Sequence, residues 1–168
     1  FPFNKEAWAP QVNVLKDTHR VIAFDNRGFG KSGKDDEKTT ITLMANDLIR
    51  FMDALNIEKA VVAGLSMGGY ILMNAVIRFP SRFEGIVLCD TQCISDTDEA
   101  REKRYKTIEQ IEKGGQKEFA EGFIPKLFGK KTFDEKPEVV QATMQAIMST
   151  SPGTLTATLD ALAQRTET

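Results

Sequence analysis

The sequence is poor in the residues that most often take part in catalysis and metal binding. It has a single histidine, His19, and only two cysteines, Cys89 and Cys93, in 168 residues. With so few of these side chains, a zinc site is not expected. Cys89 lies in an apolar stretch, where cysteine usually acts as a small buried hydrophobic residue. This cysteine usage favours a reducing, cytoplasmic location.

Long apolar runs and an excess of charge of one sign are also missing. No run approaches the ~20 apolar residues that a membrane-spanning helix needs. The chain has 22 lysines and arginines against 24 aspartates and glutamates, a formal net charge of −2, and these charges are spread along it. The sequence therefore predicts a globular protein with neither nucleic acid nor a membrane as a partner.

What the first half of the chain does contain is an alternation of apolar runs and amphipathic stretches. Apolar residues at helical spacing predict helices over 6–16, 42–55 and 67–79. Apolar runs predict buried strands over 20–25, 59–65 and 84–90, the first buried on both faces. This alternation is typical of an α/β fold with parallel strands and right-handed crossovers, whose functional residues lie beyond the carboxyl ends of the strands.

The second half has a different character. Residues 96–113 are highly charged, and helical spacing continues over 116–128, 138–148 and 152–164. We therefore expect four helices and no strand, and we divide the chain into a core segment, 1–94, and a helical lid segment, 95–168. The apolar stripes of these helices are interpreted as packing, with the lining of an apolar substrate pocket as the alternative.

A short glycine-rich motif, Gly64-Leu65-Ser66-Met67-Gly68, joins the predicted strand 59–65 to the helix that follows it. A serine at a sharp strand-to-helix turn fits a nucleophile elbow. In such a turn, side chains two residues before and after the serine would collide, so glycine is expected at both positions. The alternative is an ordinary glycine turn in which Ser66 only caps the helix.

Another glycine-rich segment follows the predicted strand 20–25. Its Gly30-Lys31-Ser32 stretch is similar to the end of a phosphate-binding loop, but Asp25 stands where that loop needs its first glycine. A nucleotide site is therefore not predicted. Asp25 and Arg27 are instead expected to organise the loop by hydrogen bonds.

Four motifs together resemble the α/β-hydrolase superfamily, in its subgroup with a helical lid, which includes 3-oxoadipate enol-lactonases and small carboxylesterases. They are Asp25-x-Arg27-Gly28-x-Gly30-x-Ser32, Gly64-Leu65-Ser66-Met67-Gly68-Gly69, Phe79-Pro80-x-Arg82-Phe83 and Leu88-Cys89-Asp90-Thr91. The resemblance implies a partial α/β-hydrolase parallel sheet, strands four to six, with flanking helices and an all-helical lid.

The resemblance also implies roles for individual residues. Ser66 would be the catalytic nucleophile, and the backbone N–H of Met67 would be one donor of the oxyanion hole. Phe1 would supply the second donor, since Phe1-Pro2 is similar to the continuation of the family's His-Gly pair. The implied activity is that of a serine hydrolase acting on a small-molecule carboxylic ester or lactone through an acyl-enzyme, a reaction that needs no cofactor.

The family's catalytic acid and histidine follow its seventh and eighth strands, and these 168 residues show no counterpart of them. His19 precedes the fourth strand, so we expect it at the opposite sheet edge from Ser66. Asp90 ends the sixth strand at the correct edge and is an alternative acid, although an anchor for the following loop is favoured.

A serine hydroxyl without a base is a poor nucleophile. We therefore expect a fragment that is inactive alone, whose base and acid come from further residues or a companion chain. A ligand-binding receptor on a hydrolase scaffold and an inactive fragment remain alternatives.

Overall fold

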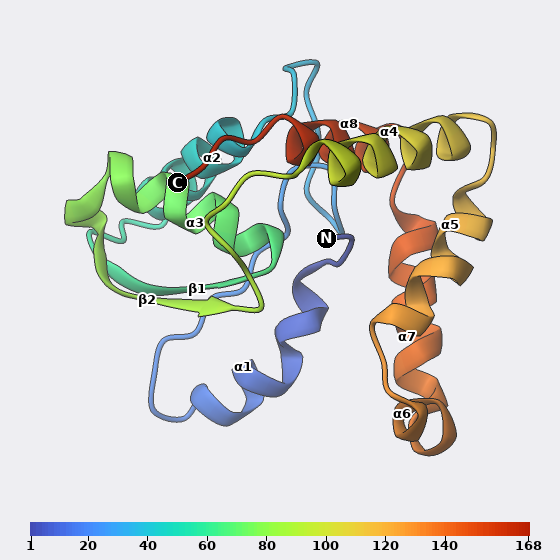
Figure 1. The fold of residues 1–168 in the computed structure, drawn as a ribbon. Helices are drawn as coiled ribbons and strands as arrows, with labels where there is room; N and C mark the ends of the chain where they lie inside the picture. The colour runs from blue at the N-terminus through green and yellow to red at the C-terminus, as the bar shows by residue number, and fades with distance from the viewer. The chain divides into compact units, whose positions relative to one another are not determined.

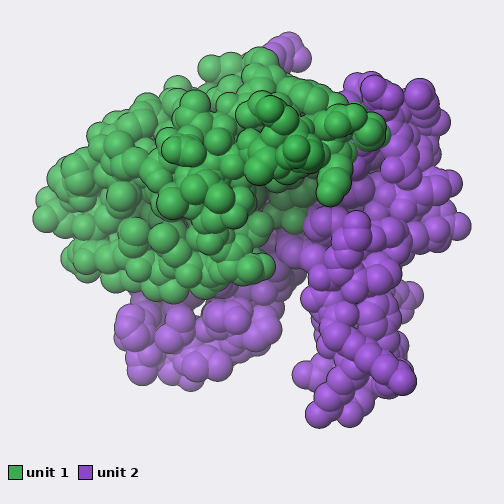
Figure 2. All heavy atoms as spheres, in the orientation of Figure 1, with its two compact units in different colours: residues 1, 37–106, 157–168 green, residues 2–36, 107–156 purple.

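The computed structural model describes residues 1–168, which form two compact units (Figure 2). Unit 1 comprises residue 1, 37–106 and 157–168, and unit 2 comprises 2–36 and 107–156. These bounds differ from the division at residue 95, which remains a prediction about core and lid. None of the helices combines the length and the apolar character that a bilayer crossing would need.

Unit 1 is built around two parallel strands, β1 (Ala60–Leu65) and β2 (Phe83–Cys89), joined by the helix α3 (Met67–Arg78) and the short turn η2 (Pro80–Arg82). The strands lie side by side in Figure 1, in a register that runs to the pair Leu65–Cys89. The predicted strand–helix–strand unit with parallel strands is therefore confirmed. Its two strands end at the same edge of the sheet, where Ser66 and Asp90 follow them.

The core of unit 1 lies between α3 and α2 (Ile41–Ala54), which pack against each other while α3 also packs on β1. The helix α2 begins after Thr40, whose side chain accepts a hydrogen bond from the Leu43 N–H and so caps the first turn. The apolar face predicted from the sequence is the face that is buried. The buried side chains of the two helices include Met44, Leu48, Met52, Ile71 and Leu72.

Two expectations about the strands are wrong. Residues 20–25 form no strand, although their composition favours one. A strand needs a neighbour to complete its hydrogen bonds, and in the observed sheet β1 pairs with β2 alone. The two strands that do form are also less buried than expected: Val61 is 62% exposed and Val87 is 48% exposed. The sequence pattern shows which conformation a residue favours, but the partner strand and the segments that bury a strand come from elsewhere in the chain.

Unit 2 is mainly helical. Near the N-terminus the predicted helix over 6–16 is split into η1 (Lys5–Trp8) and α1 (Ala9–Leu15), with Asn4 capping the first turn. Its later elements are α5 (Gln116–Phe123), η3 (Ile124–Lys126), α6 (Lys130–Glu135) and α7 (Pro137–Ser149). Two further helices, α4 (Asp98–Glu112) and α8 (Pro152–Ala163), have residues in both units. As predicted, no strand forms in this half of the chain.

The short helix α6 was not predicted. It has six residues, and Phe133 is its one large apolar side chain, so no periodic stripe announces it. The Phe133 ring packs edge-on against the Phe128 ring, with ring centres 6.3 Å apart, and α6 also packs on α7. Tertiary contacts, which local spacing does not show, therefore stabilise this helix.

Candidate active site

Ser66 has the backbone strain that the sequence predicts for an elbow. It lies between the last residue of β1 and the first residue of α3, with φ 49° and ψ −110°. A positive φ is unfavourable for a residue with a Cβ, and such strain is concentrated at functional sites. The side chain is half-buried rather than enclosed in the core.

The glycines around Ser66 have different roles. A Cβ on Gly64 would lie 2.4 Å from the Gly68 carbonyl oxygen, so only glycine fits at position 64. A Cβ on Gly68 would meet nothing within 4 Å, so the expectation that both glycines avoid one collision is wrong for Gly68. The close contact is between the Cα side of Gly64 and the backbone of Gly68, so a side chain is excluded at position 64 but not at position 68. A third glycine, Gly69, makes room for Thr91, whose Oγ1 would lie 2.4 Å from an added Cβ.

The Ser66 hydroxyl is not used to cap α3. Ser66 is the residue before the helix, but its side chain makes no capping hydrogen bond, so the capping interpretation is wrong. Its backbone is held instead: its N–H donates to the Cys89 carbonyl and its own carbonyl accepts from the Gly69 N–H, both at 2.9 Å. The turn is therefore held by main-chain hydrogen bonds, and the hydroxyl takes no part in capping.

Met67 is the first residue of α3, and its side chain is only 2% exposed. The N–H groups of a first helical turn have no acceptor within their own helix and carry the positive end of the helix dipole. An amide in this position is suited to stabilise a negatively charged oxygen. The geometry is thus compatible with the predicted role of Met67, which remains a prediction.

The end of β2 lies beside the elbow. Asp90 is exposed and has φ 43°, the second strained turn at this sheet edge. It is Thr91, not Asp90, that bonds to the elbow: its Oγ1 donates to the Ser66 carbonyl at 2.9 Å. The ion pairs of Asp96, rather than Asp90, anchor the loop after β2, so the expectation that Asp90 anchors this loop is wrong. A role of Asp90 as the catalytic acid remains an open prediction.

The two remaining residues named from the sequence lie in different units. Phe1 is half-buried in unit 1, the unit that also contains Ser66. His19 is an exposed residue of unit 2, and its ring nitrogen Nδ1 lies 2.8 Å from the Thr18 hydroxyl oxygen. The oxyanion role of Phe1 is still a prediction.

In unit 2, the glycine-rich segment is organised as predicted. The carboxylate of the buried Asp25 accepts the Lys5 N–H at 2.7 Å and the Lys31 N–H at 3.0 Å, and Arg27 forms an ion pair with Asp35 at 2.7 Å. Burial raises the pKa of Asp25, but these backbone hydrogen bonds and the Lys5 ammonium outweigh it and hold the pKa below its ordinary value. The loop is a hydrogen-bonded scaffold.

Sequence reasoning missed a buried ion cluster in unit 1. The carboxylate of Asp96 accepts hydrogen bonds from Arg104 and from Arg165, the latter at 2.6 Å, and Arg165 also lies over the ring of Tyr70, 4.3 Å from its centre. Arg165 is 69 positions from Asp96, so no local spacing could have revealed the pair. Tyr70 lies on α3 one helical turn after Ser66, and the cluster therefore ties this helix to the segment after α8.

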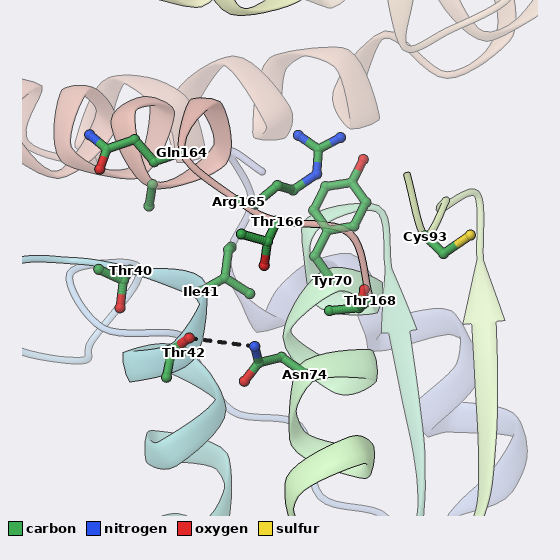
Figure 3. Close-up of a pocket in the computed structure, with 11 residues that line it drawn as sticks. Thr40, Ile41, Thr42, Tyr70, Asn74, Cys93, Gln164, Arg165, Thr166 and Thr168 are labelled. Atoms are coloured by element: carbon green, nitrogen blue, oxygen red, sulfur yellow. Dashed lines mark hydrogen bonds between the residues drawn. The ribbon is translucent and has the colours of Figure 1, made fainter. Parts of the chain in front are cut away.

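A hollow of about 360 Å³ lies beside this cluster (Figure 3). Tyr70 and Asn74 of α3, Thr42 of α2 and Arg165 contribute to its wall, and Asn74 donates a hydrogen bond to Thr42 there. The hollow does not include Ser66, Met67 or Phe1. No three His, Cys, Asp or Glu side chains gather anywhere in the structure as possible ligands of a metal ion.

Comparison with known proteins places this geometry in a family. A family profile described as alpha/beta hydrolase fold matches residues 1–128. The 3-oxoadipate enol-lactonase 1 of Acinetobacter baylyi is 32% identical over 143 residues, which are 85% of this chain and 52% of that protein. This chain thus spans about half the length of that curated relative.

Two solved structures are similar over nearly the whole chain. A thermophilic esterase from Thermogutta terrifontis is 36% identical with a TM-score of 0.94, over 99% of this chain and 62% of that one. The enol-lactonase from Burkholderia xenovorans LB400 is 26% identical with a TM-score of 0.88, over 97% and 62%. The strained serine, the parallel strands and these matches agree, and the chain belongs to the alpha/beta hydrolase fold family.

Proposed function

We propose that this polypeptide is a serine hydrolase of carboxylic esters or lactones that acts through an acyl-enzyme on Ser66. The observation that carries the proposal is the positive φ of Ser66 at a strand-to-helix turn, with its hydroxyl not used for capping. An esterase and enol-lactonases among the similar proteins support the same substrate class.

In the proposed reaction the Ser66 oxygen attacks the substrate carbonyl carbon while a base accepts the hydroxyl proton. The carbonyl electrons move to the oxygen, and the Met67 N–H, with a second donor near Phe1, stabilises that negative charge. Collapse of the intermediate expels the alcohol, which takes the proton from the base; in a lactone this alcohol stays attached to the acyl group. Water then repeats the sequence and releases the acid.

The base and acid are proposed to come from outside these 168 residues, in further segments of the same polypeptide or in a companion chain. The chain spans 52% of the enol-lactonase and 62% of the esterase to which it is similar. The covalent mass of the natural polypeptide and of any chain that copurifies with it tests this part separately. Ser66-dependent turnover by the 168 residues alone would contradict it while leaving the nucleophile assignment standing.

The nucleophile is tested with p-nitrophenyl acetate and the natural enzyme. We expect a burst of one nitrophenolate per active site followed by slower turnover, and a loss of roughly a thousandfold or more in kcat in Ser66→Ala. The matched control is Ser81→Ala, because Ser81 is an exposed serine of η2. An unchanged rate in Ser66→Ala would overturn the proposal. Ligand retention without turnover across acyl lengths would favour a receptor instead.

A further inference from the structure

The Thr91 hydroxyl donates a hydrogen bond to the elbow, to the Ser66 carbonyl oxygen at 2.9 Å. That carbonyl belongs to the same planar peptide group as the Met67 N–H. In a trans peptide the C=O and N–H bonds point in opposite directions, so fixing one fixes the other. The Gly69 N–H donates to the same carbonyl oxygen, also at 2.9 Å, so Thr91 supplies the side-chain donor among the hydrogen bonds that hold this peptide group.

The Thr91 side chain is held in this position by its surroundings. The positive φ of Asp90 turns the chain at the end of β2, just before Thr91. Thr91 then packs against the Cα of Gly69, where an added Cβ would lie 2.5 Å from the Thr91 methyl carbon and 2.4 Å from its hydroxyl oxygen. The Ser66 N–H, bonded to the Cys89 carbonyl, ties the two strand ends together on the other side of the serine.

We propose that Thr91 is a positioning residue for the oxyanion hole, which orients and polarises the Met67 N–H through the Ser66 carbonyl. The proposal rests on the proposed function. A donor on a peptide carbonyl draws electron density from the nitrogen and strengthens the opposite N–H as a donor. Because the negative charge on the substrate oxygen is largest in the transition state, this effect acts mainly on kcat.

The test compares two substitutions in the natural enzyme. Thr91→Val keeps the branched shape and removes the hydroxyl, whereas Thr91→Ser keeps the hydroxyl. We expect Thr91→Val to lower kcat for p-nitrophenyl acetate roughly tenfold with little change in KM, and to weaken binding of a trifluoromethyl ketone in proportion. Thr91→Ser should remain within about threefold of the unmodified enzyme in both measurements.

The control variant makes the same chemical change on α7, a helix of unit 2. Thr143 is half-buried and its hydroxyl donates to the Val139 carbonyl at 2.8 Å, so Thr143→Val removes a comparable hydrogen bond. It should leave both kcat and ketone affinity unchanged. If Thr91→Val also leaves them unchanged while Ser66→Ala abolishes turnover, the positioning role is overturned and the hydrolase proposal stands.

A measurement that needs no turnover completes the test. The Met67 amide proton is followed by nuclear magnetic resonance, and its signal should move upfield in Thr91→Val because the N–H is less polarised. Little movement is expected in Thr91→Ser. An unmoved signal in Thr91→Val would overturn the link between the hydroxyl and the amide, whatever the activity. Turnover that persists in Ser66→Ala would instead contradict the hydrolase proposal itself.

Discussion

The two units each bury one aspartate, and they neutralise it in different ways. Asp25 and Asp96 are both 8% exposed. In unit 2, both Asp25 oxygens accept backbone N–H groups from nearby residues, and the Lys5 ammonium adds a partly exposed charge at 3.2 Å. In unit 1, Asp96 is bonded to two guanidinium groups, and the Arg165 side chain is only 3% exposed.

This difference shows what each aspartate organises. The amides around Asp25 are fixed dipoles; one belongs to its own loop, at Lys31, and the other to Lys5, 20 positions earlier, so removing the carboxylate disturbs the loop and its link to η1. Asp96 compensates a buried cation that comes from a segment 69 positions away and that also lies on Tyr70 of the elbow helix. Losing Asp96 would leave that cation buried without a counter-charge, which is much less favourable than losing a hydrogen bond.

The largest effect is therefore expected in unit 1. Asp96→Ala should reduce the free energy of unfolding by about 3–5 kcal/mol, because Arg165 would remain buried and unpaired. Urea titration monitored by circular dichroism measures this. The double variant Asp96→Ala/Arg165→Met should recover part of the loss, since it removes the buried cation as well. A double variant no more stable than Asp96→Ala would show that the cation is not the cause.

A surface ion pair provides the control for this prediction. Lys131 and Glu135 lie 3.7 Å apart on α6, and their side chains are 82% and 58% exposed. Glu135→Gln should leave the urea midpoint unchanged, because water screens such a pair. A loss comparable to that in Asp96→Ala would mean that charge, rather than burial, sets the effect.

Local spacing predicted the parts of the fold that local residues determine. The helix predicted from the apolar spacing over 42–55 is α2, and the glycine-rich turn predicted at Ser66 is the strained elbow. Residues 20–25 have strand-forming composition but form no strand, because a strand also requires a partner. The six residues of α6 show the reverse case, a helix stabilised by packing that its own sequence does not announce.

The site shows the same limit. The Gly64-x-Ser66 spacing predicts the strained serine because the cause lies within a few residues of it. Thr91 was visible only as part of a family motif, since its hydrogen bond to the Ser66 carbonyl crosses 25 positions between two strand ends. Asp96 and Arg165 are 69 positions apart, so the spacing of residues in the sequence gives no sign of their ion pair.

A smaller effect is expected in unit 2. Asp25→Asn leaves a single acceptor oxygen where two backbone donors, the N–H groups of Lys5 and Lys31, each bond to a different carboxylate oxygen. One of those donors would then face an amide NH₂ group. The expected loss is about 1–3 kcal/mol in the free energy of unfolding, measured by the same titration. If Asp25→Asn lowered the free energy of unfolding as much as Asp96→Ala, backbone N–H partners and guanidinium partners would not differ in their contribution to stability.

Acid should reduce the difference between the two sites and is the mildest test. Burial raises the pKa of both carboxyls, but their hydrogen bonds and cations outweigh it, so both values lie below the ordinary 3.8. A lowered pKa stabilises the folded chain above pH 3.8, and that stabilisation is lost as the pH falls through the folded value. Unfolding curves taken from pH 6 down to about pH 2 should therefore converge for the unmodified protein and Asp96→Ala, because protonation removes the same counter-charge as the substitution. Curves that stay parallel over this range would mean that Asp96 does not titrate there, and that its contribution is packing rather than charge.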